Sequence, residues 1–129
     1  MISAATRDAV RRRARDGCEY CGLPQAAEPD AHFHIEHILP RQHGGGDDES
    51  NLALACHRCN RHKGPNLSGI DPESRRATLL FHPREQIWDE HFRVENCEIL
   101  GVTPTGRATV SLLQMNAPVR VELRRWIGA

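Results

Sequence analysis

Long apolar runs are missing from this chain of 129 residues, and aromatic residues make up only 5% of it. Its apolar stretches are only a few residues long, for example Leu79-Leu80-Phe81, so no segment reaches the roughly 20 residues of a transmembrane helix. The first seven residues lack the apolar region of a secretory signal, and we therefore expect a cytoplasmic protein without a membrane partner. With so few aromatic side chains, we expect the core to need a second source of stability.

Net charge is also absent, because 17 basic residues balance 17 acidic ones. This balance argues against a protein that coats nucleic acid over its whole surface, so any such contact must come from a local basic patch. The basic residues are sixteen arginines and one lysine, Lys63. Arginine suits phosphate contacts, but a genome-wide codon bias would give the same composition. The length predicts a single domain over residues 1–129.

Hydrophobic patterning and turn residues predict an α+β fold. Ser3 is a suitable N-cap for a helix over residues 3–16, and Gly17 is placed to end it. The arginines at 11–13 suit the negative end of the helix dipole and equally suit a DNA-facing role. The other expected elements are strands at 32–37, 52–55 and 77–81, a loop at 42–51, a short helix from Cys56 to Gly64, an irregular segment at 83–92, a hairpin at 93–101, and helices at 105–114 and 118–127.

Four of the five cysteines form two pairs with the spacing of zinc knuckles, Cys18-x-x-Cys21 and Cys56-x-x-Cys59. In a reducing compartment, paired cysteines favour metal binding over disulfides. Two such turns complete a tetrahedral site of four thiolates, which leaves no open coordination position. The sequence therefore predicts a structural Zn²⁺ that compensates for the small aromatic core. Cys97 is interpreted as an ordinary, partly buried residue.

The residues between and around these knuckles carry a second pattern. It reads Cys-Glu-Tyr-Cys-Gly from Cys18, His-Ile-Glu-His-Ile-Leu-Pro from His34, Gly-Gly-Gly-Asp-Asp-Glu-Ser-Asn-Leu from Gly44, and Leu-Ala-Cys-His-Arg-Cys-Asn-Arg-His-Lys-Gly from Leu54. In this order and spacing the stretches resemble the HNH nuclease family. The resemblance implies a zinc-stapled ββα-metal core over residues 18–66. We expect an N-terminal helix within residues 1–17 before this core, and a C-terminal extension of strands and helices over 67–129 packed on it.

The resemblance also implies roles for single residues. Glu36 matches the acidic ligand of the catalytic divalent ion, and His37 matches the general base. Asn51 matches the central asparagine, which holds the loop and helps orient that histidine. Asn60 matches the last motif position, a metal ligand that is histidine in some members, so this chain is an H-N-N variant. The two hard oxygen donors favour Mg²⁺ or Mn²⁺ over zinc at the catalytic site.

Other polar residues near the motif admit more than one interpretation. His34 shares a strand face with His32 and Glu36, and is either a third ligand, a phosphate contact or a partly exposed residue. His57 and His62 flank Cys59 and are expected at the surface, with competition as metal ligands as the alternative. Arg41, Arg61 and Lys63 form the local basic patch, which contacts phosphates or is simply a solvated helix face.

The second half of the chain resembles an extension found on a subgroup of bacterial HNH proteins. We expect it to complete the core, through the side chains of Trp88, Phe92, Leu112, Leu113 and Trp126. Arg84 or Arg107 is an alternative source of additional DNA contacts.

The predicted function is that of an HNH endonuclease, a divalent-metal-dependent hydrolase of phosphodiester bonds in DNA. RNA stays open as a substrate, as do nicking against double-strand cutting and a monomer against a homodimer. Two alternatives belong to other classes: a non-catalytic zinc module that binds nucleic acid, and a protein-interaction module.

Overall fold

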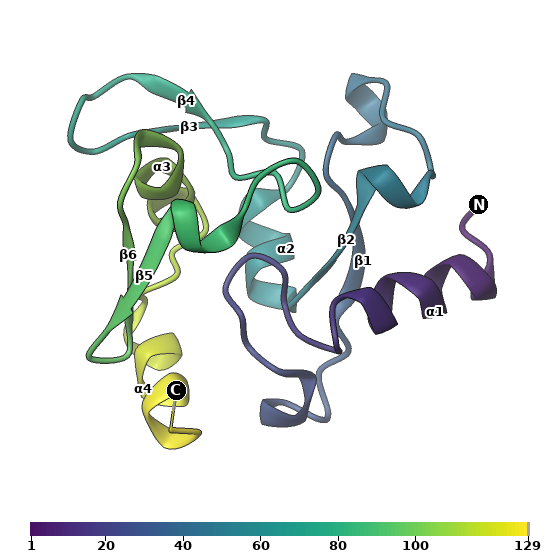
Figure 1. The fold of residues 1–129 in the computed structure, drawn as a ribbon, viewed down its shortest axis with the longest axis horizontal. Helices are drawn as coiled ribbons and strands as arrows, with labels where there is room; N and C mark the ends of the chain where they lie inside the picture. The colour runs from purple at the N-terminus through teal and green to yellow at the C-terminus, as the bar shows by residue number, and fades with distance from the viewer. Residues whose placement is uncertain (129) are drawn as a thin grey trace. The chain divides into compact units, whose positions relative to one another are not determined.

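The computed structural model describes residues 1–128 and divides into two compact units, one from Met1 to Pro65 and one that begins at Asn66. Both units combine helices with short antiparallel strands, as the predicted α+β class requires (Figure 1). Each unit has its own buried apolar side chains. Within residues 1–128, no helix has the length and apolar character that crossing a membrane would require.

The first unit is built on a two-stranded antiparallel ribbon. Its strands are β1 (His34–His37) and β2 (Leu52–Ala55), with His34 opposite Ala55 and His37 opposite Leu52. Helix α1 (Ala4–Arg13) lies to one side of this ribbon and helix α2 (His57–Lys63) to the other (Figure 1). The order β1, β2, α2 is the predicted ββα arrangement, and three short 3-10 turns at 25–27, 41–43 and 49–51 connect the elements.

Helix α1 begins as predicted but ends earlier. The Ser3 hydroxyl accepts a hydrogen bond from the amide of Thr6 at 3.1 Å, which caps the first turn. The predicted end at Gly17 is wrong, because Arg15 and Asp16 already adopt left-handed backbone with φ of 53°. Their conformation terminates the helix at Arg13, and Gly17 pairs instead with Pro24 in an isolated bridge.

Burial is unequal along the two strands of the ribbon. All four residues of β2 are buried, as expected for an apolar strand between two helices. In β1, Glu36 is buried and His34 is exposed, so the strand face that was predicted to be polar turns partly inward. The predicted strand at 32–37 begins only at His34. The predicted loop at 42–51 contains one of the 3-10 turns and the end of another.

The second unit contains two hairpins and two helices. Strand β3 (Ser68–Ile70) pairs with β4 (Ala77–Leu79), and β5 (Phe92–Glu95) pairs with β6 (Glu98–Gly101). Helices α3 (Pro104–Leu112) and α4 (Pro118–Trp126) follow, each with proline in its first turn. The second hairpin and both helices were predicted. Strand β3 was missed because its three residues carry no alternating pattern, and it forms through pairing with β4.

The core of the second unit contains part of the predicted set of aromatic and leucine side chains. The ring of Phe92 contacts Phe81 edge-on at 5.2 Å and stacks with Trp88 at 4.9 Å, and Leu113 is fully buried. The prediction for Trp126 is wrong, since its side chain is 85% exposed at the end of α4. Helix α4 instead buries two arginines, Arg120 and Arg124.

Several arginines of the second unit have structural partners. Arg120 donates to the carbonyl of Leu113 at 2.6 Å, and Arg124 donates to that of Met115 at 2.7 Å. These carbonyls lie just beyond α3, where a helix end leaves acceptors unsatisfied. Arg107 holds the fully buried carboxylate of Asp71 through two bonds of 2.9 and 3.0 Å. This ion pair gives Arg107 a role other than the alternative DNA contact.

Candidate metal centres and active-site pocket

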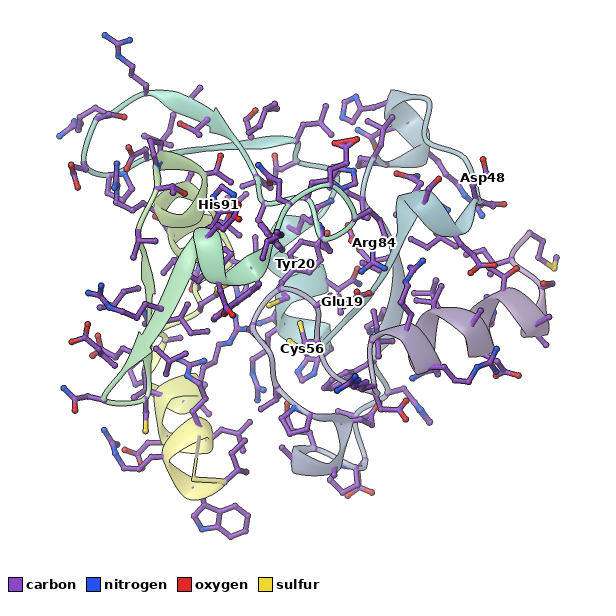
Figure 2. The ribbon with its side chains drawn as sticks, in the orientation of Figure 1. Glu19, Tyr20, Asp48, Cys56, Arg84 and His91 are labelled. Atoms are coloured by element: carbon purple, nitrogen blue, oxygen red, sulfur yellow. The ribbon has the colours of Figure 1, made fainter. Side chains whose placement is uncertain are left out.

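Four cysteine sulfurs converge between the loop after α1 and the beginning of α2. The sulfurs of Cys18, Cys21, Cys56 and Cys59 all lie within 4.8 Å of one another, and all four residues are buried. The Cys21 and Cys56 sulfurs are 3.8 Å apart, close to the roughly 3.8 Å edge of a tetrahedron with 2.3 Å Zn–S bonds. Figure 2 shows sulfur atoms gathered beside Cys56. The predicted cluster therefore has the donor set and spacing of a structural zinc site.

Local backbone geometry supports the same assignment. The amide of Cys21 donates to the Cys18 sulfur and that of Cys59 to the Cys56 sulfur, both at 3.4 Å. Each pair is thus a tight turn in which the first sulfur accepts a backbone hydrogen bond. Burial raises the pKa of the Cys18 and Cys59 thiols well above their usual range. Thiolates at this buried place therefore need a bound cation, which couples metal binding to folding.

The first knuckle is attached directly to the ribbon. The amide of Glu19 donates to the carbonyl of Leu54, and the amide of Leu54 donates to the Glu19 carboxylate, both at 2.8 Å. The next residue, Tyr20, is fully buried and donates its hydroxyl to Oε2 of Glu36 at 2.7 Å. The cysteine cluster is therefore connected to the strand that carries Glu36 and His37.

Glu36 belongs to a buried polar cluster. Its Oε1 atom lies 2.5 Å from Nζ of Lys63, which also donates to the carbonyl of Ile38 at 3.1 Å. Burial raises the pKa of Glu36, and the charge of Lys63 opposes this shift. Lys63 is only 2% exposed. The prediction that Lys63 contacts phosphates is therefore wrong, because its ammonium group neutralises Glu36 inside the unit.

An open pocket of about 370 Å³ brings the predicted catalytic residues together. Glu36 and His37 at the end of β1 line it with Asn60 of α2 and Arg41 of the following turn. Its remaining lining residues are Ile35, Pro40, Gln42, Gly64 and Pro65. Asn51 is not among them. The ββα arrangement thus places a carboxylate, an imidazole and a carboxamide around one cavity.

Asn51 fastens the loop that follows β1. Its Oδ1 accepts from the amide of Leu39 at 2.8 Å, and its Nδ2 donates to the carbonyls of Leu39 and Gly46 at 3.0 and 2.9 Å. Gly45 makes this closure possible, because a Cβ there would lie 1.7 Å from the Leu39 carbonyl oxygen. These contacts are the ones that a loop-holding asparagine requires.

Sequence reasoning missed one acidic partner of the histidine. Nε2 of His37 lies 2.7 Å from Oδ1 of Asp47, which also accepts from Nη2 of Arg41 at 3.0 Å. Hydrogen bonds from His37, the amino group of Met1 and Arg41 hold the pKa of Asp47 well below its usual range. The sequence carried no signal for this contact, because three consecutive acidic residues after a glycine run indicate only a polar loop.

The remaining predicted residues have different environments. His34 is exposed on β1, Arg41 is exposed and lines the pocket, and Arg61 is exposed on α2. His57 and His62 are half-buried rather than fully at the surface. In α1, Arg11 donates to the carbonyl of Phe33 and Arg13 to that of Leu52, so both bind backbone within the unit.

The chemistry of the pocket fits a hard divalent cation. Glu36 and Asn60 supply oxygen donors of the kind that Mg²⁺ and Mn²⁺ prefer. The short contact with Lys63 shows that the Glu36 carboxylate already attracts a cation at this position. Lys63 is therefore an internal competitor for one of its oxygens.

Comparison with known proteins gives one match. The family model described as HNH endonuclease matches residues 18–66, from the first knuckle to just beyond α2. No curated protein and no solved structure matches the chain.

Proposed function

We propose, from the match of residues 18–66 to the HNH endonuclease family model, that the protein is a divalent-metal-dependent endonuclease acting on DNA. The observation that carries the proposal is the pocket at which Glu36, His37 and Asn60 meet. The cysteine cluster supports it, because one pair opens α2, which carries Asn60, and the other pair flanks Tyr20, whose hydroxyl binds Glu36.

His37 is the proposed general base. An imidazole with a pKa near about 6.5 can take a proton from water at neutral pH. Glu36 and His37 are neighbours on β1, so their side chains leave the strand on opposite faces. Glu36 is directed to Tyr20 and Lys63, whereas His37 reaches Asp47. The two residues can therefore divide metal binding and proton transfer between them.

Glu36 and Asn60 are the residues that would hold the catalytic ion. When bound, Mg²⁺ or Mn²⁺ would neutralise phosphate charge and stabilise the leaving oxygen. Tyr20 keeps the Glu36 carboxylate oriented through its hydrogen bond at 2.7 Å. The exposed guanidinium groups of Arg41 and Arg61 are the proposed phosphate contacts, and they position DNA without reading its sequence.

The test is cleavage of supercoiled plasmid across a series of Mg²⁺, Mn²⁺, Co²⁺ and Ni²⁺, with the zinc-loaded protein in no added divalent metal as the control. The intact protein should nick or linearise the plasmid with at least one ion. His37→Ala should abolish cleavage while circular dichroism and zinc content stay unchanged. The matched control is His34→Ala, which removes an exposed histidine from the same strand. Cleavage by His37→Ala at the wild-type rate would contradict the assignment.

A non-catalytic nucleic-acid-binding module is the second candidate, and one observation favours it. The Glu36 carboxylate already has a cationic partner in Lys63. A module that only binds nucleic acid needs the cysteine cluster and the exposed arginines but no catalytic ion. DNA binding by the zinc-loaded protein without any added divalent metal, together with no cleavage in any of the four metals, would support this candidate over the nuclease.

A further inference from the structure

We propose that Asp47 is a positioning residue that fixes the ring of His37, and that Asn51 acts on this histidine through Asp47. The inference rests on the proposed nuclease function and deepens it. It assigns a role to a loop carboxylate that lies outside the pocket lining.

The contact is close and local to the loop. Oδ1 of Asp47 lies 2.7 Å from Nε2 of His37, and their side chains are 33% and 17% exposed. A histidine that acts as base needs a fixed ring direction, and a hydrogen bond to its second nitrogen supplies one. The observed contact provides that restraint.

The same contact selects a tautomer. An ionised carboxylate only accepts hydrogen bonds, so Nε2 of His37 must carry the proton. Nδ1 of the neutral ring then holds the lone pair that accepts a proton from water. Nε of Arg41 lies 3.3 Å from the same Nε2. In this tautomer both nitrogens carry a hydrogen, so Arg41 Nε cannot donate a hydrogen bond to His37 Nε2. Arg41 instead binds Asp47 through Nη2 at 3.0 Å and keeps the carboxylate in place.

Asn51 connects this pair to the rest of the loop. Its Nδ2 donates to the carbonyl of Gly46, the residue directly before Asp47, and it also donates to the carbonyl of Leu39. No hydrogen bond within residues 1–128 joins the side chains of Asn51 and His37. One route from the asparagine to the histidine therefore passes through Leu39 along the backbone, and the route that reaches the imidazole ring passes through Gly46 and Asp47.

The experiment compares Asp47→Asn and Asp47→Ala with Asp48→Asn. Asp48 is the matched control, because it offers the same charge one residue away and is exposed on the outer loop (Figure 2). Both Asp47 variants should lower kcat by about 100-fold, the scale of general-base catalysis, with KM nearly unchanged. Asp48→Asn should keep the wild-type kcat. A merely electrostatic role predicts the opposite, since losing an acidic group near DNA tightens binding and leaves kcat intact.

A second measurement does not depend on activity. Nitrogen NMR of the imidazole rings reports the tautomer, and the His37 signals are identified by their loss in His37→Ala. The wild type should show a protonated Nε2, and Asp47→Ala should show a mixture of tautomers. An unchanged His37 tautomer in Asp47→Ala, or a wild-type kcat, would overturn the proposal. Should the wild type fail to cleave with any metal, the proposed function fails while the NMR result still decides the positioning role. Asp47→Asn preserves the size of the side chain and serves where Asp47→Ala does not fold.

Discussion

At the scale of the residue, the chain's single lysine is the clearest exception to the rule that charged side chains lie at the surface. Lys63 lies inside the first unit with its ammonium group 2.5 Å from the Glu36 carboxylate. Removing one partner of a buried ion pair leaves an uncompensated charge, which costs far more than losing an exposed pair. Lys63 therefore stabilises the first unit when no catalytic ion is bound, and it competes with any cation for Glu36.

Replacing Lys63 tests both consequences. In the zinc-loaded protein without added Mg²⁺ or Mn²⁺, Lys63→Met should lower the free energy of unfolding by about 3 kcal/mol, because Glu36 stays buried without its counter-charge. Added Mn²⁺ should restore more stability to this variant than to the wild type, since an ion that binds only the folded state stabilises it. Thermal unfolding with and without Mn²⁺ measures both effects. The control is Arg61→Met, which removes an exposed charge from the same helix. Equal unfolding temperatures for zinc-loaded wild type and Lys63→Met without added Mn²⁺ would refute the idea.

Asp71 gives a prediction of pH dependence in the second unit. The Arg107 guanidinium holds the pKa of this buried carboxyl well below its usual range. A carboxyl whose pKa is lower in the folded state contributes stability above its unfolded pKa of about 3.9, and loses it as the pH falls further. The stability difference between wild type and Asp71→Asn should therefore be largest near neutral pH and shrink below about pH 4. Urea unfolding at several pH values measures it. Glu73→Gln, at the exposed partner of Arg107, should show little of this dependence. A difference that stays constant down to pH 2 would contradict the assignment.

At the scale of the element, the sequence predicted what short-range chemistry determines. The β2 strand matched its predicted bounds because an apolar run flanked by turn residues needs no distant information. The cysteine spacing identified both knuckles, and proline placed the start of α4. The burial of Lys63 was not predictable in this way, because it depends on a carboxylate on another element. The contact between Asp47 and His37 likewise depends on how a glycine-rich loop closes.

The closure of that loop is itself testable at two adjacent glycines. Gly45→Ala would place a Cβ 1.7 Å from the Leu39 carbonyl oxygen, so the loop must shift and Asn51 must lose its contacts. We expect a loss of about 1–3 kcal/mol in unfolding free energy and a strong loss of plasmid cleavage, with zinc content retained. Gly46→Ala is the matched control, since within the described residues a Cβ at this position would have nothing to clash with inside 4 Å. Cleavage by Gly45→Ala at the rate of Gly46→Ala would show that the loop conformation does not matter.

At the scale of the whole molecule, stability comes from two different sources. The first unit has little aromatic surface and places four buried cysteines at the junction of its knuckles. Within the described residues, the second unit contributes no ligand to that cluster and relies on packed side chains such as Phe81, Phe92 and Ile99. The spacing of the cysteines predicted the cluster of the first unit without any other information. The division of the chain into two units after Pro65 depends on which residues contact one another in space, and the spacing of the cysteines carries no information about that.

Metal removal should therefore act on one unit more than the other. Zinc-finger modules lose their fold when the ion is removed, because the binding free energy is part of the folding free energy. Chelation of the intact protein should increase hydrogen exchange at Leu54 in β2, which the first knuckle holds through Glu19. It should leave the amide of Ile99 protected, since that amide donates to Asn116 in the second unit at 2.8 Å. Hydrogen exchange followed by mass spectrometry, before and after chelation and again after Zn²⁺ is restored, measures both segments. Simultaneous loss of protection at Leu54 and Ile99 would instead support the single domain expected from chain length. Full protection of Leu54 in the chelated protein would mean that the cysteine cluster does not hold the first unit together.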